Sequence, residues 1–111
     1  MRLRLRPNLS IKAKLHYEFK GKVTRWEANP KFFLVAMPKK YFKEINELGE
    51  TLRRGWGSVR VNACVGRTSW QTSIFPSSAG TYEMPLKASV RKAEAIEEGS
   101  TIFVQLELID F

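Results

Sequence analysis

Arginine and tryptophan side chains gather between residues 53 and 70, beside two closely spaced glycines. Guanidinium groups next to indole rings can stack on nucleobases and pair with phosphate oxygens, and Gly55 and Gly57 would let the backbone approach a ligand closely. The pattern favours a stacking platform for bases or a pocket for a phosphorylated small molecule, with core packing of the tryptophans as the alternative. The candidate binding residues here are Arg53, Arg54, Trp56, Arg60, Arg67 and Trp70.

Basic residues also crowd the beginning of the chain. Residues 1–25 hold eight of the 19 basic residues and one of the 11 acidic ones, so most of the net charge of +8 lies there. Lys12 and Lys14 stand two positions apart, which is about 6.6 Å along a strand and similar to the spacing of successive phosphates. The pattern predicts a basic arm over residues 1–9 followed by one domain over 10–111. The alternative is that exposed lysines only protect a strand edge.

A third candidate combines the loop Phe75–Gly80 with Lys87 and Arg91, which follow it. Small residues ahead of a helix can direct backbone N–H groups at an anion. The spacing of a phosphate-binding loop is absent, and a plain connection between two elements is the alternative.

Residues for catalysis and metal binding are scarce. His16 and Cys64 are the single histidine and cysteine, so a zinc site of the usual Cys/His type and an intramolecular disulfide are excluded within one chain. We interpret Glu94, Glu97 and Glu98 as solubilising groups at a helix end. No cofactor motif is present, and the sequence favours a binding module over an enzyme.

Period-two alternation and turn residues predict a mainly β domain with two short helices. Gly66 and Arg67 have the chemistry of a type II′ hairpin turn. The apolar run 32–37 predicts a strand covered on both faces, and Pro38 and Pro85 each open a helix. The predicted strands are 11–23, 32–37, 59–65, 70–75, 81–84 and 101–109, the helices are 39–48 and 86–96, and turns lie at 28–31 and 76–80.

Two segments share one outline: strand, Met-Pro, helix, Gly-Ser, strand. The first contains Met37-Pro38 and Gly57-Ser58, and the second contains Met84-Pro85 and Gly99-Ser100. A helix placed between two strands buries its apolar face against them, so two such units can pack about a pseudo-twofold axis. The repeat predicts a small closed or split β-barrel flanked by two short helices.

Several runs then resemble a known family, domain of unknown function 1905, a family of small prokaryotic proteins. They are Phe33–Pro38, Gly57–Val61, Trp70–Pro76, Gly80–Lys87, Val90–Lys92 and Glu98-Gly99. The resemblance implies a double-split β-barrel, the fold class of AbrB-type regulators and some antitoxins. In those regulators the element similar to residues 84–99 occurs once per chain and the barrel needs a dimer. Here the repeat would complete a barrel within one chain, and the resemblance implies no known activity.

The sequence lacks the apolar core of a signal peptide and any run long enough for a membrane helix. A free thiol without a disulfide suits a reducing, cytoplasmic compartment. We expect a binding module for an anionic partner, nucleic acid favoured, with no cofactor and no membrane, as a monomer or a dimer. The alternative is a binder of a small anionic ligand, or a minor enzyme, with a pocket between the barrel and the loops at 53–57 and 75–80.

Overall fold

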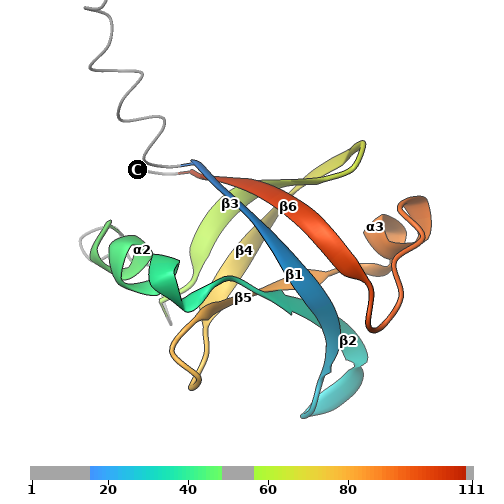
Figure 1. Cartoon of the computed structure of the whole chain (residues 1–111), viewed down its shortest axis with the longest axis horizontal. Coiled ribbons are helices and arrows are strands. Elements are labelled where there is room, and N and C mark those ends of the chain that lie inside the picture. Colours follow the sequence, from blue (N-terminus) through green and yellow to red (C-terminus); the bar gives the residue numbers. More distant parts are fainter. Residues whose placement is uncertain (1–15, 49–56, 110–111) are drawn as a thin grey trace, which may run out of the picture.

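The computed structural model describes residues 16–48 and 57–109 of the chain. These residues form strands, one 3-10 turn (η1) and two short helices, labelled as in Figure 1. In chain order they are β1 His16–Trp26, β2 Asn29–Ala36, η1 Lys39–Tyr41, α2 Phe42–Leu48, β3 Val59–Val65, β4 Thr68–Pro76, β5 Tyr82–Leu86, α3 Ala88–Ala93 and β6 Thr101–Leu108. None of the helices described in these ranges is long and apolar enough to span a membrane.

The strands close into an antiparallel barrel in the order β1-β2-β5-β4-β3-β6 (Figure 1). The predicted mainly β fold and its barrel are therefore confirmed. Period-two alternation is the cause, because it places every second side chain inside. In β3 and β6 the inward residues are all buried, and they meet Tyr17, Phe19 and Ile74 in one hydrophobic core.

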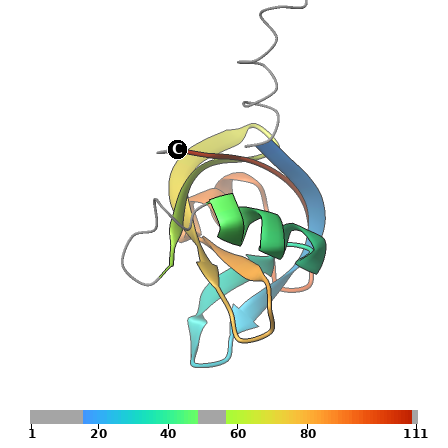
Figure 2. The same ribbon diagram turned by 90° about the vertical axis from the view of Figure 1, so that its left-hand side faces the viewer.

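The internal repeat is visible in the strand pairing. Exchanging β1 with β4, β2 with β5 and β3 with β6 leaves the set of neighbouring strands unchanged. The two glycines of the repeat also share a left-handed backbone, with φ of 84° at Gly57 and 89° at Gly99. The helices lie at opposite ends of the barrel, and Figure 2 shows α2 across one of them.

Strand β2 differs from its prediction. The β1–β2 turn uses residues 27 and 28, so Asn29 to Lys31 already belong to the strand. Only Val35 of β2 is fully buried, and the side chain of Phe32 is 51% exposed. The prediction of a strand covered on both faces was therefore wrong, because no helix of the described chain covers the outer face of β2.

The second helix is shorter than predicted. Pro85 lies inside β5 rather than opening a helix, and α3 covers only residues 88–93. The helix ends where Ala95 adopts a left-handed backbone with φ of 53°. The N–H of Ile96 then donates to the carbonyl of Arg91 at 2.9 Å, and the N–H of Ala95 donates to the carbonyl of Lys92 at 3.5 Å. This bond pattern is a Schellman motif, and Ile96 is buried beside it.

Ala95→Gly should raise the free energy of unfolding by about 1 kcal/mol, because glycine adopts the left-handed backbone without the clash that a Cβ brings. Urea denaturation followed by circular dichroism measures the change. Ala93→Gly, inside α3, is the matched control and should lower it by roughly 0.5–1 kcal/mol. A loss of stability in Ala95→Gly would contradict the motif.

Candidate functional site

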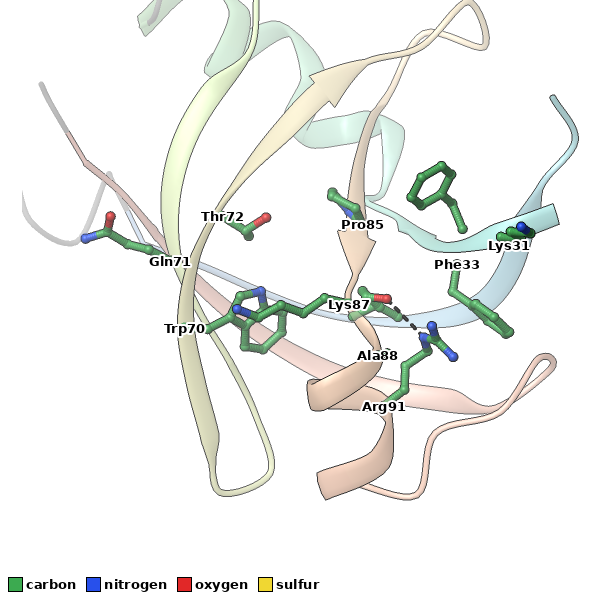
Figure 3. A pocket seen from close by; sticks show the side chains of 11 residues that line it. Lys31, Phe33, Trp70, Gln71, Thr72, Pro85, Lys87, Ala88 and Arg91 are labelled. Atoms are coloured by element: carbon green, nitrogen blue, oxygen red, sulfur yellow. Dashed lines mark hydrogen bonds between the residues drawn. The ribbon is translucent and has the colours of Figure 1, made fainter. Parts of the chain in front are cut away.

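A cavity of about 390 Å³ lies at the barrel end that carries α3 (Figure 3). It is formed where the start of β2, the end of β5 and the first half of β4 come together. Figure 3 shows the end of β5 between Trp70 on one side and Phe33 on the other. The lining residues are Lys31, Phe32, Phe33, Trp70, Gln71, Thr72, Pro85, Leu86, Lys87, Ala88 and Arg91.

Pro85 explains why the barrel wall opens here. The N–H of Met37 donates to the carbonyl of Tyr82 at 2.9 Å, so Tyr82 directs its backbone groups toward β2. The backbone N–H and C=O groups of successive residues in a strand point to opposite sides, and therefore those of Glu83 and Pro85 point toward β4. Glu83 pairs with Phe75, but Pro85 has no N–H with which to continue the ladder. The β4–β5 pairing accordingly stops after two residue pairs, and the cavity begins there.

Ala88 keeps the opening unfilled. It stands three residues after Pro85, and the repeat places Tyr41 at the same distance after Pro38. The ring of Tyr41 packs edge-on against Tyr17, with their centroids 5.0 Å apart. Ala88 lines the cavity, and its small side chain fills less of that space than a tyrosine would.

Three cations surround this largely apolar space. Lys31, Lys87 and Arg91 line the cavity, and no carboxylate is among the described residues that do so. Neither lysine forms an ion pair within the described ranges. An excess of positive charge around an apolar cavity with an aromatic on each side suits a flat ligand that carries an anionic group.

Arg91 is held in place for such a contact. Its Nε donates to the carbonyl of Leu86 at 3.0 Å, the bond drawn in Figure 3. Its guanidinium carbon lies 3.9 Å from the centre of the Phe33 ring. Since Nε is committed to the backbone, the two Nη groups form the part of the fork that can pair with a carboxylate or phosphate.

Glu94, near the end of α3, fixes the hairpin that carries Trp70. One of its carboxylate oxygens accepts from the Thr68 hydroxyl at 2.6 Å and from the Arg67 backbone N–H at 3.2 Å. The hairpin turn has a positive φ at Gly66 but not at Arg67, which confirms the predicted type II′ arrangement. Our interpretation of Glu94 as a merely solubilising group was therefore wrong, since it bonds to a strand distant in sequence.

Residues 19–106 match the family described as Domain of unknown function (DUF1905). The chain belongs to this family. Every residue that lines the cavity lies within the matched range. No curated protein matches the chain.

This DUF1905 domain brings together residues from separate sequence hypotheses. Trp70, from the arginine and tryptophan cluster, and Lys87 with Arg91, from the third candidate, line one cavity. Five candidates, Lys12, Lys14, Arg53, Arg54 and Trp56, lie outside the described residues.

Arg60 and Arg67 are not among the lining residues. Arg60 donates at 3.2 Å to the side chain of Gln71, which is one of them. The loop over residues 75–80, which was predicted to act with Lys87 and Arg91, connects the end of β4 to the start of β5. Lys87 and Arg91 follow the other end of β5, so the loop does not reach these two residues. The sequence hypotheses missed Lys31, Phe32, Phe33 and Ala88, and the Met-Pro repeat was the signal that could have identified Ala88.

Among the described residues, Tyr17 and Glu18 have shifted pKa values, and neither of them lines the cavity. His16 is exposed and lies 3.2 Å from the Glu18 carboxylate. Hydrogen bonds from Gln105 and then from His16 lower the pKa of Glu18. Burial, followed by the nearby Glu44, strongly raises the pKa of the Tyr17 phenol. No group of three potential metal ligands occurs within the described ranges.

Proposed function

We propose that this DUF1905 domain binds a small organic anion that has a flat, apolar part. The observation that carries the proposal is the cavity with Lys31, Lys87 and Arg91 around it and no carboxylate among its described lining residues. Its volume of about 390 Å³ falls within the range of small-molecule pockets, about 300–1,000 Å³.

The division of chemistry around the cavity supports this ligand class. Trp70 and Phe33 are partly buried against the core, so each has a rigid ring edge or face toward the opening. Arg91 is oriented by its bond to Leu86, and Lys87 adds a second charge nearby. The described lining contains no histidine, cysteine or carboxylate for proton transfer or nucleophilic attack, which favours binding over turnover.

The test uses anilinonaphthalene sulfonate, a flat anion whose fluorescence rises in apolar surroundings. We expect saturable binding by the full chain, and Lys87→Glu should weaken it by about tenfold or more, because a repulsive charge replaces an attractive one. Lys92→Glu is the matched control, since Lys92 is exposed on α3 and does not line the cavity.

Equal affinities in the two variants would overturn the proposal, because long-range charge alone would then explain the binding. Far-UV circular dichroism and thermal melting of both variants ensure that the dye reports a folded cavity rather than loosened packing.

Other features of this domain stay predictions. They include a double-split barrel with two flanking helices, a likeness to AbrB-type regulators, a basic arm over residues 1–9, a prokaryotic source and a cytoplasmic location. A small basic domain with a single cysteine is consistent with each of them. Of these features, the proposed ligand site uses only helix α3, which carries Ala88 and Arg91.

A further inference from the structure

Two aromatic side chains are exposed at the tip of the β1–β2 hairpin. Trp26 is 45% exposed and Phe32 is 51% exposed, and their ring centroids lie 6.0 Å apart with an angle of 52° between the planes. Large apolar side chains that contact each other on a surface, rather than in the core, are typical of recognition sites. We call Trp26 and Phe32 the aromatic tip.

The aromatic tip continues from the cavity. Phe32 belongs to both, because it lines the cavity and packs against Trp26. A ligand that fills the cavity and extends past Phe32 therefore meets a second flat surface at Trp26. The two surfaces form one path from β4 across the end of β5 to the hairpin.

The hairpin is anchored in this position. The Nε of Arg25 donates to the Glu98 carboxylate at 2.7 Å, and one Nη donates to the Pro30 carbonyl at 3.0 Å. The guanidinium carbon of Arg25 also lies 4.6 Å from the centre of the Phe33 ring. These contacts tie the tip to the turn before β6, so the aromatic tip is preorganised for binding.

Charge sets the direction of the path. Lys31 stands next to Phe32 in the sequence, and it lines the cavity together with Lys87 and Arg91. An adjoining cavity of about 400 Å³ shares Arg91 and Phe33, and it is also lined by Arg25, Glu97 and Glu98, so its charges balance. That side therefore offers a polyanion no net attraction, whereas Lys31 adds positive charge on the side of the aromatic tip.

We propose that the cavity and the aromatic tip together bind single-stranded nucleic acid, with one base in the cavity and a neighbouring base on the aromatic tip. The inference rests on the proposed function, because the cavity is its anchor. Single strands alternate flat bases with phosphates, and proteins bind them through aromatic faces flanked by cations. An acidic peptide satisfies the cations but leaves the aromatic tip without stacked partners.

The test compares single-stranded oligothymidylate of about six nucleotides with thymidine monophosphate, by fluorescence anisotropy and calorimetry on the full chain. The oligomer should bind more tightly than the monomer. Trp26→Ala should lower the affinity for the oligonucleotide by about tenfold, which is the usual effect of losing one stacked base. The same variant should leave the affinity for anilinonaphthalene sulfonate unchanged. Phe103→Ala is the matched control, because Phe103 is 46% exposed on β6 and does not line the cavity.

Salt dependence provides an independent check. Neutralising phosphates with three lysine and arginine side chains predicts a slope of about −2 for log affinity against log salt with a single strand. Lys31→Gln should reduce the slope by roughly one third.

Three outcomes would overturn the inference: no effect of Trp26→Ala on the oligomer, equal binding of duplex DNA, or equal competition by an acidic peptide. If dye binding persists in those cases, the proposed anion site stands and only its nucleic-acid ligand is wrong. If the dye also fails to bind, the proposed function itself is wrong.

Discussion

Gly21→Ala is expected to lower the free energy of unfolding by about 2 kcal/mol, a large part of the stability of a small domain. A Cβ at this position would lie 2.5 Å from the Cγ2 of Val35 and 3.3 Å from the carbonyl oxygen of Ala36. Val35 is completely buried and the carbonyl belongs to the barrel wall, so neither can move away without disturbing the core.

The position of Gly21 in β1 explains the close approach. β1 pairs with β6 as far as Lys22 and with β2 from Val23 onward, so the strand changes its closest neighbour beside Gly21. Strands at such barrel corners often carry glycine, because a side chain would block the close contact.

A double-mutant cycle identifies the clash. Val35→Ala alone should cost about 2 kcal/mol through lost burial, and it creates the space that the new methyl group needs. The double variant should therefore lose clearly less than the sum of the two single changes, as measured by urea denaturation. Strict additivity would show that Val35 is not the residue that excludes a side chain at Gly21.

Local patterns in the sequence predicted much of the barrel. The alternation of Val59, Val61, Ala63 and Val65 needs no knowledge of neighbours, because it follows from strand geometry alone. The Gly66 turn is equally local, since two residues decide its type. Such features are determined within a few positions of the chain, and they were confirmed.

Features that depend on which strands are neighbours were harder to predict. An apolar run such as Phe32 to Met37 is compatible with burial on one face or on two. The pairing of β2 with β1 and β5 leaves Phe32 outside, and the β2–β5 pairing joins segments about fifty residues apart. Pro85 is ambiguous in the same way, because proline starts helices but also ends the pairing of a strand.

The candidate site could be predicted only in pieces. Trp70 and Arg91 were selected for their chemistry, but in separate hypotheses, because nothing local places β4 beside α3. Phe33 was assigned to a covered strand and so was not considered as a ligand contact. The cavity results from barrel closure, which brings β2, β5 and β4 together at one end.

Ala88→Tyr is expected to abolish detectable binding of anilinonaphthalene sulfonate while the barrel stays folded. Ala88 is exposed and lines the cavity, and a tyrosine there would add a phenol ring at the cavity wall. A phenol ring in a cavity of about 390 Å³ would obstruct a flat ligand without entering the buried core. Fluorescence titration should show a loss of affinity of about a hundredfold, the consequence of excluding most of the ligand's apolar contact.

Ser89→Tyr is the matched control, because Ser89 is the next residue of α3, is exposed and does not line the cavity. It should bind the dye with unchanged affinity, and both variants should melt within a few degrees of the original chain, as expected for surface substitutions. If Ala88→Tyr still binds the dye normally, the dye occupies another surface and the cavity is not the anion site. If binding is lost only in Ala88→Tyr, the dye binds in the cavity, and the small side chain at position 88 is what leaves room for it.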